Sequence, residues 1–193
     1  MRLGSVGLVL LAVTLARGPV KAAESWQDKL PACLACHGEG GISPTPEVPS
    51  LAAQPDLFTQ WQLVYFRDGT RASDTMVPVA KDLTDAEIRA LGGYFAALPP
   101  PQPGPGADPA PDLSAAGAKL AAEGRCGNCH LPNFAGQSEM PRLAAQQENA
   151  LVKALEDYKS GARRGRGNAA MPEITFGLSA DDMKALAHFL SRQ

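Results

Sequence analysis

Two five-residue segments contain all four cysteines and two of the three histidines of this 193-residue chain. They read CLACH at 33–37 and CGNCH at 126–130. On a helix, side chains three and four positions apart share a face, so each segment presents two thiols and an imidazole together. This pattern is typical of haem c attachment, in which two thiols form thioethers with one haem and the histidine binds its iron. The predicted haem-binding residues are Cys33, Cys36, His37, Cys126, Cys129 and His130.

Three other uses of paired cysteines fit this pattern less well. A four-thiolate zinc site is disfavoured because the pairs stand far apart and a histidine follows each of them. A disulfide within each pair would suit an exported protein, but it leaves the histidines and the duplication unexplained. A thioredoxin-like redox pair normally follows a strand, and no strand pattern precedes either segment. Haem attachment is therefore favoured.

The chain is an internal repeat. Aligning Cys33 with Cys126 also aligns three further pairs of segments in the same order. They are VPSLAAQ (48–54) with MPRLAAQ (140–146), FRDGTR (66–71) with YKSGAR (158–163), and residues 76–95 with 171–190. Between the halves, residues 99–112 are half proline, which disfavours a helix and predicts a semi-rigid linker. We expect a first domain at 23–98 and a second at 113–193.

The N-terminus predicts export. Arg2, an apolar run at 6–15 and small residues near Ala22 are the three parts of a signal peptide, assigned here to residues 1–22. An uncleaved anchor is the alternative, but the run is shorter than the roughly 20 residues that span a bilayer. We expect the mature protein in the periplasm. The sequence leaves open whether it associates peripherally with a membrane.

Each half is predicted to fold as helix, loop, helix, loop, helix. Asp56 precedes an apolar-periodic stretch, and Thr84 with Glu87 forms a capping-box pattern. In the second half, Ser114 is expected to cap a helix, and Ser179 repeats the pattern before the last one. No alternating strand is evident, so the fold class is all-α. Domains this small bury little core on their own, which agrees with a haem filling each of them.

A sixth iron ligand is expected from methionine. Met76 and Met171 occupy matching places in the repeat, each shortly before a proline, whereas Met140 and Met183 align with ordinary apolar residues. Core packing is the usual role of a methionine. A thioether opposite histidine is the ligand pair that raises the reduction potential in cytochromes c. The predicted iron ligands are therefore His37 and Met76 in one domain, and His130 and Met171 in the other.

The order of these motifs resembles class I cytochrome c, doubled. It is most similar to the two-haem cytochromes of the c-four type, and the resemblance covers essentially the whole mature chain. It implies two domains facing each other across a pseudo-two-fold axis. It also implies that the carbonyls of Pro49 and Pro141 accept hydrogen bonds from the axial histidines. One departure is Leu131, which stands where the first domain has Gly38, so the second loop is expected to close differently over its haem.

These features predict an electron carrier, not an enzyme. A haem ligated on both faces passes one electron but has no vacant position for substrate. By resemblance, the donor would be a quinol-oxidising cytochrome complex of a respiratory chain, and the acceptor a terminal oxidase. The alternatives are the electron-accepting subunit of a periplasmic dehydrogenase, and a two-haem enzyme or sensor with one open iron. His188 has no counterpart in the repeat and is expected to be structural.

Charge divides unevenly between the halves. Without Arg2, Arg17 and Lys21 of the signal, the formal net charge of −2 becomes −5, which argues against a nucleic-acid partner. All of this excess lies in the first half, because the ten acids of residues 101–193 balance ten bases. Lys159, Arg163, Arg164 and Arg166 form a basic cluster. The cluster is expected to dock an acidic partner, and the alternatives are that one arginine pairs with a haem propionate or that the loop is simply solvated.

Overall fold

The computed structural model describes residues 25–163 and 170–193. Within these two ranges the regular structure is helical, apart from one isolated bridge between Gln137 and Met140. The all-α prediction is confirmed. The predicted signal peptide, at 1–22, lies outside the described residues.

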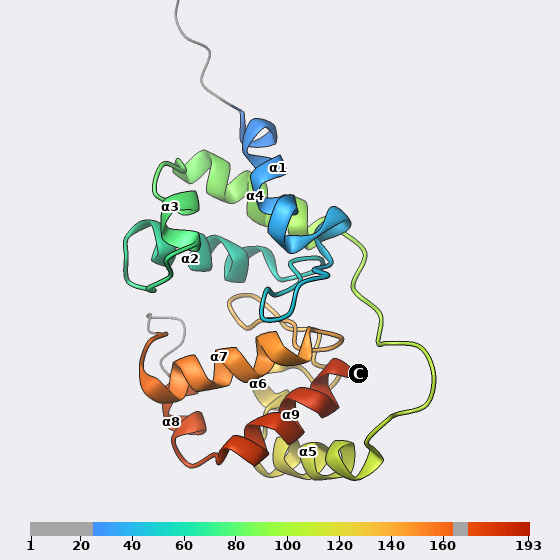
Figure 1. The fold of residues 1–193 in the computed structure, drawn as a ribbon. Coiled ribbons are helices and arrows are strands. Elements are labelled where there is room, and N and C mark those ends of the chain that lie inside the picture. The colour runs from blue at the N-terminus through green and yellow to red at the C-terminus, as the bar shows by residue number, and fades with distance from the viewer. Residues whose placement is uncertain (1–24, 164–169) are drawn as a thin grey trace, which may run out of the picture.

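The first half of the chain packs its helices around one apolar cluster. Its elements are α1 (Trp26–His37), the 3₁₀ helix η1 (Glu39–Gly41), α2 (Asp56–Arg67), α3 (Met76–Ala80) and α4 (Asp85–Ala97). Helix α4 packs against both α1 and α2, and α3 packs on α2 (Figure 1). Leu63 and Phe66 of α2 meet Leu91 and Phe95 of α4 in the centre of this cluster.

The second half repeats this arrangement. Its helices are α5 (Pro111–Glu123), α6 (Gly127–His130), α7 (Glu148–Ser160), α8 (Ala170–Phe176) and α9 (Ala180–Ser191). Helix α9 packs against α5 and α7, and α8 lies on α7. Ala121, Leu151, Leu186 and Leu190 form the centre of a second apolar cluster. The two halves are thus separate cores, as the repeat predicts.

Two of the three predicted helix caps are present. The side chains of Thr84 and Ser179 each accept a hydrogen bond from the third residue of the helix that follows, and each completes a capping box. The prediction for Ser114 is wrong. Helix α5 already begins at Pro111, and the Ser114 hydroxyl donates instead to the carboxylate of Asp108. Proline is favoured at the first helical position, where its missing N–H is not needed.

Two short helices were not anticipated. Helices α3 and α8 occupy segments that the sequence analysis assigned to loops, and each contains one of the predicted methionine ligands close to its start. Helix α6 is also short, but it contains the Cys-x-x-Cys-His segment that the spacing placed on a helix. In the first domain the Cys-x-x-Cys-His segment ends the continuous helix α1, whereas in the second it is separated from α5 by a break at Gly124 and Arg125.

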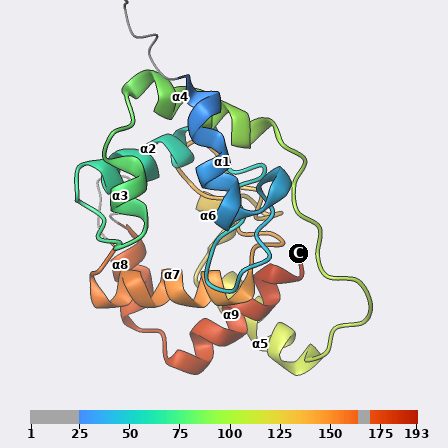
Figure 2. The ribbon, with the colours of Figure 1, turned by 45° about the horizontal axis from the view of Figure 1, so that its top comes forward.

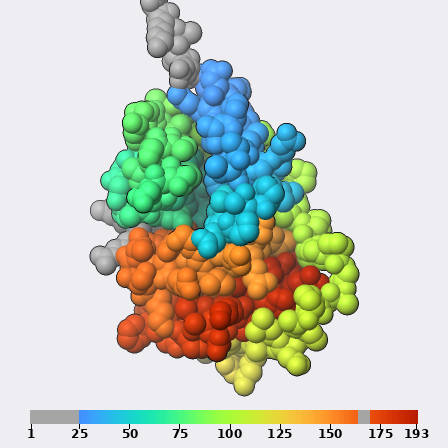
Figure 3. Space-filling model, in the orientation of Figure 1, coloured from blue at the N-terminus to red at the C-terminus, as the bar shows by residue number. Residues whose placement is uncertain are grey.

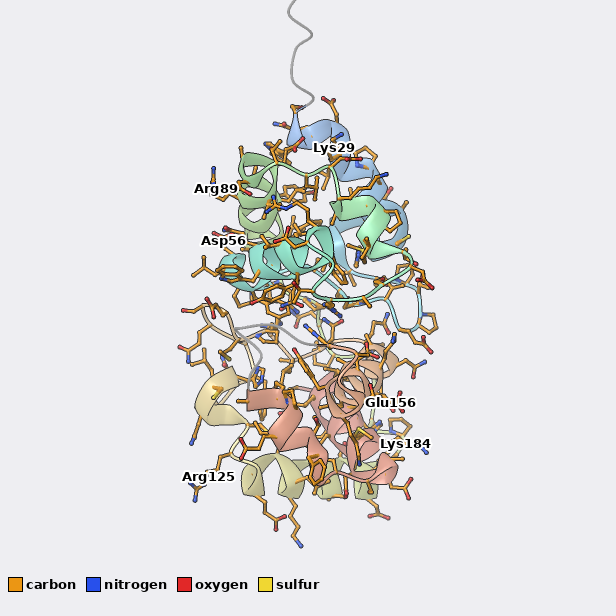
Figure 4. The ribbon with its side chains drawn as sticks, turned by 90° about the vertical axis from the view of Figure 1, so that its left-hand side faces the viewer. Lys29, Asp56, Arg89, Arg125, Glu156 and Lys184 are labelled. Atoms are coloured by element: carbon orange, nitrogen blue, oxygen red, sulfur yellow. The ribbon has the colours of Figure 1, made fainter. Side chains whose placement is uncertain are left out.

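The two halves lie one above the other, and the connection between them runs outside the bundle (Figures 1 and 2). The space-filling view shows the lower half packed directly under the upper one, on the side that α7 presents (Figure 3). Seen edge-on, side chains of both halves fill the space between them; Lys29 and Arg89 lie on one half and Arg125 and Lys184 on the other (Figure 4). No helix in the described ranges has the length and apolarity to cross a bilayer.

Candidate haem sites and the interface between the domains

The two cysteines of each motif have different environments. Cys33 and Cys126 are half-buried, while Cys36 and Cys129 are exposed. Burial raises the pKa of the Cys33 and Cys126 thiols. Cys33 packs against the apolar cluster of the first domain and Cys126 against that of the second. The two pairs therefore belong to separate cores, which suits one covalent attachment in each domain.

Each histidine of the motifs is held by a backbone carbonyl. His37 Nδ1 lies 2.8 Å from the carbonyl oxygen of Pro49, and His130 Nδ1 lies 2.8 Å from that of Pro141. A carbonyl oxygen can only accept, so Nδ1 must carry the proton and donate, which leaves the Nε2 lone pair available for a metal. Burial lowers the pKa of both imidazoles, which favours their neutral form. Neutral imidazole is the form that binds iron.

The residue after each histidine has nearly the same backbone conformation in the two domains. Gly38 has φ 82° and ψ 156°, and Leu131 has φ 68° and ψ 156°. A Cβ atom at Gly38 would lie 1.9 Å from the carbonyl oxygen of Ile42, yet Leu131 carries a Cβ at the same place. The chain beyond the turn must therefore take another path in the second domain, where Gly136 N donates to the carbonyl oxygen of His130 at 3.0 Å. The turn is shared and the loop that follows it differs.

The predicted methionine ligands lie at equivalent places in the fold. Met76 is the first residue of α3 and packs against the same apolar cluster as Cys33. Met171 is the second residue of α8, and its carbonyl accepts the hydroxyl of the fully buried Thr175 at 2.9 Å. Met183, by contrast, is buried within α9. Both candidate ligands are half-buried at the start of a short helix.

Two arginines meet where the domains touch, at matching positions of the repeat. Arg71 Nη1 donates to Gln62 Oε1 at 2.7 Å, and Arg163 Nη2 donates to the same oxygen at 2.9 Å. Each guanidinium also lies over an aromatic ring of its own domain, Phe66 or Tyr158. Burial, together with the charge of Arg163, lowers the pKa of Arg71 to about 9, and burial also lowers the pKa of Arg163. The arginine guanidinium nevertheless keeps its charge in proteins, so the two groups form a cationic pair.

Among the described residues, neither guanidinium lies within salt-bridge distance of a carboxylate, although the charge of Asp157 acts on both. Arg163 Nε is buried without a hydrogen-bond partner, and Thr59 Oγ1 is the only other such side-chain atom among the described residues. Buried charges are normally paired, because an unpaired one is costly. A pair of buried cations with a free donor fits an anionic group that belongs to the cofactor, such as a haem propionate. The sequence pointed to this role only as one alternative for the arginines of this loop.

The docking role predicted for the basic cluster is wrong for Arg163. Its side chain is 6% exposed and faces the other domain, so it is not available to a partner protein. Lys159 is exposed. Arg164 and Arg166 lie outside the described residues.

His188 is structural, as expected. Its Nδ1 lies 3.0 Å from Glu148 Oε2 at the start of α7, and its Nε2 lies 2.8 Å from Asp108 Oδ1 in the connecting segment. The buried imidazole thereby ties the segment between the domains to the second domain. Within the described residues, no group of three or more His, Cys, Asp or Glu side chains is placed to hold a metal ion.

Known proteins are similar to the chain along most of its length. The family model described as "Cytochrome c" matches residues 114–193, and "Cytochrome C oxidase, cbb3-type, subunit III" matches residues 20–95. The chain is 35% identical to cytochrome c4 of Thiocapsa roseopersicina, over 82% of this chain and 85% of that protein. It is 32% identical to the "Thiosulfate dehydrogenase electron acceptor" of Thiomonas intermedia, over 96% of this chain and 90% of that protein.

A solved structure has the same fold. Reduced recombinant cytochrome c4 from Pseudomonas stutzeri superposes with a TM-score of 0.77 at 27% identity, covering 86% of this chain and 95% of that one. Two helical domains, each with a Cys-x-x-Cys-His segment and a carbonyl-bound histidine, define a two-domain c-type cytochrome. The chain belongs to the cytochrome c4 family. It is an electron-transfer protein that carries two covalently bound haem c groups.

Proposed function

We propose that each domain holds its haem through one set of four residues. Cys33, Cys36, His37 and Met76 serve the first haem, and Cys126, Cys129, His130 and Met171 serve the second. The pair of His–Pro hydrogen bonds at 2.8 Å supports this most directly, because it orients both imidazoles and leaves Nε2 basic. We also propose domain limits at 23–98 and 113–193, with residues 99–112 as the linker, whose last two residues already begin α5.

The haem supplies an iron that accepts and returns one electron. The protein's own residues keep that iron in a single coordination, exclude other ligands and place the two domains against each other. Thioether attachment holds each haem even when the chain is unfolded. Strong ligands on both sides leave no position for substrate, so the function that this arrangement supports is electron carriage between redox proteins.

Haem counting tests the assignment. Denatured wild-type protein is expected to retain two haems, and Cys36→Ala or Cys129→Ala to weaken retention in its own domain. His37→Gln and His130→Gln should abolish low-spin ligation in one domain each, whereas His188→Gln should leave both spectra unchanged. The assignment is wrong if the exported protein binds zinc and shows no haem absorbance.

We propose that the protein is exported and works in the periplasm, as a carrier between a quinol-oxidising cytochrome complex and a terminal oxidase. Haem c attachment and the predicted signal at 1–22 support export. A second role, electron acceptor of a dehydrogenase, is favoured by the relative from Thiomonas intermedia, which has that description for thiosulfate dehydrogenase. Reduction rates with a purified quinol-oxidising complex and with thiosulfate dehydrogenase plus thiosulfate separate the two roles, since the physiological donor should reduce the protein much faster.

A further inference from the structure

The face between the domains contains a reciprocal pair of glutamines. Gln54 Oε1 accepts the N–H of Arg142 at 3.1 Å, and Gln54 Nε2 donates to the carbonyl oxygen of Arg142 at 3.0 Å. In the opposite direction, Gln146 Oε1 accepts the N–H of Ser50 at 2.7 Å, and its Nε2 donates to the Ser50 carbonyl at 2.9 Å. Gln54 and Gln146 occupy matching places in the repeat, so the contact is symmetric.

The residues that these glutamines hold are not ordinary interface residues. Ser50 and Arg142 each directly follow the proline whose carbonyl accepts the hydrogen bond from the histidine of its own domain. The carbonyl of Pro49 and the N–H of Ser50 belong to one peptide group, as do the carbonyl of Pro141 and the N–H of Arg142. Each histidine is therefore joined through a single peptide group to a glutamine of the other domain.

Such a chain of hydrogen bonds is cooperative. An acceptor on the N–H of a peptide group polarises it and makes its carbonyl oxygen a stronger acceptor. A stronger acceptor at Nδ1 increases the basicity of the imidazole as a metal ligand. The chain is shielded from water, because Gln54 is 4% exposed, Gln146 7%, His37 7% and His130 6%.

We infer that each glutamine is a positioning residue for the haem of the opposite domain: Gln54 tunes the second haem through Arg142, Pro141 and His130, and Gln146 tunes the first through Ser50, Pro49 and His37. Contact between the domains then adjusts the reduction potentials of both haems. This inference depends on the proposed axial role of His37 and His130.

A crossed pattern of potentials tests it. In Gln54→Leu, the peptide N–H of Arg142 loses its acceptor, so His130 becomes a weaker donor and the ferric state of the second haem is less stabilised. We expect the potential of the second haem to rise while that of the first stays unchanged. Gln146→Leu should do the reverse. NMR signals of each haem's methyl groups, followed during stepwise reduction, report the two potentials separately.

Gln147→Leu is the matched control. Gln147 Nε2 also crosses the interface, to the carbonyl of Ser43, but it does not contact either proline peptide. Amide hydrogen exchange gives a second readout: Gln54→Leu should speed exchange at Arg142 and Gln147→Leu should not. A shift in the glutamine's own domain, no shift at all, or an equal shift in Gln147→Leu would overturn the inference. A wild-type protein that shows no low-spin haem spectrum would instead overturn the proposed histidine ligation.

Discussion

The turns that follow the two Cys-x-x-Cys-His segments differ in one residue with a positive φ: the second has a leucine where the first has a glycine. Leu131 has φ 68°, a region in which L-residues other than glycine are strained by about 1–2 kcal/mol. Replacing Leu131 with glycine would remove this strain, but part of the gain in stability would be lost, because glycine loses more conformational entropy on folding than other residues. We expect Leu131→Gly to raise the free energy of unfolding by about 0.5–1 kcal/mol, measured by guanidinium denaturation of the holoprotein.

The reverse substitution should fail in the first domain. At Gly38 an added Cβ meets the Ile42 carbonyl at 1.9 Å, so Gly38→Leu is expected to disrupt the loop rather than merely strain it. For Leu131→Gly, a decrease in the free energy of unfolding would contradict the prediction. It would show that the contacts of the leucine side chain stabilise the fold by more than the strained backbone destabilises it.

Replacing either methionine that we propose as an axial ligand should lower the reduction potential of one haem. Histidine is a harder donor than a thioether and favours ferric iron. In Met76→His and Met171→His, we expect the haem of the altered domain to change its redox equilibrium by at least about tenfold, or about 59 mV for one electron. Optical redox titration measures this. Met140→Leu and Met183→Leu are the controls, and a comparable drop in either would show that the repeat led to the wrong methionine.

At the scale of the helices, His188 links three elements that are distant in the sequence. It lies on α9, its partners Asp108 and Glu148 lie on the connecting segment and at the start of α7, and both contacts raise its pKa. Hydrogen bonds from Ser114, from the backbone of Ala110 and from His188 lower the pKa of Asp108 to about 2. The Asp108 carboxylate is therefore charged at neutral pH and favours the imidazolium.

The sign of the resulting pH dependence follows from these shifts. A pKa raised in the folded state stabilises the protein fully below the unfolded value of about 6.5, and this stabilisation is lost as the pH rises through the folded pKa. We expect His188→Gln to lower the melting temperature clearly at pH 6 and much less at pH 9. The opposite trend, or equal losses at both pH values, would mean that packing and not charge is the main contribution of His188.

The helices were largely predictable, because their signals are local. Thr84 with Glu87 and Ser179 with Asp182 marked two helix starts correctly. The start of α5 was missed, since Pro111 looks like part of a proline-rich linker even though proline suits the first helical position. The short helices α3 and α8 were missed because five or seven residues give too little periodicity to distinguish them from loops.

At the scale of the whole molecule, the sequence predicted two domains, and its resemblance implied that they face each other, but it did not indicate which residues join them. The Cys-x-x-Cys-His segments could be proposed as haem-binding because their spacing is specific, and Met76 and Met171 could be proposed as ligands because the repeat aligned them. Gln54 and Gln146 also align, yet nothing in the sequence indicates that each binds the other domain's backbone. The sequence left the role of Arg163 open for a similar reason: a cluster of bases is usually solvated, and only the packing of the domains buries this arginine.

The buried arginine provides a test of how the domains cooperate. Arg163 contacts Gln62 of the first domain and has a free Nε donor, so we expect it to compensate negative charge at a haem edge. A cation near the iron favours the ferrous state, so Arg163→Gln should lower at least one haem potential by tens of millivolts, where about 59 mV is tenfold. A haem propionate that has lost its arginine partner should also titrate nearer to neutral pH, so that this reduction potential should depend on pH. Optical titrations at pH 6 and pH 8 measure both effects.

Salt distinguishes this role from partner docking. Lys159→Gln is the control, because Lys159 belongs to the same basic segment but is exposed. Its loss should alter only the rate of electron transfer to a charged partner, and only at low ionic strength, where surface charges are weakly screened. The effect of Arg163→Gln on the potentials should persist at high salt, since a buried charge is screened little. If Arg163→Gln instead leaves both potentials unchanged and slows transfer only at low salt, the arginine serves association and not the haem.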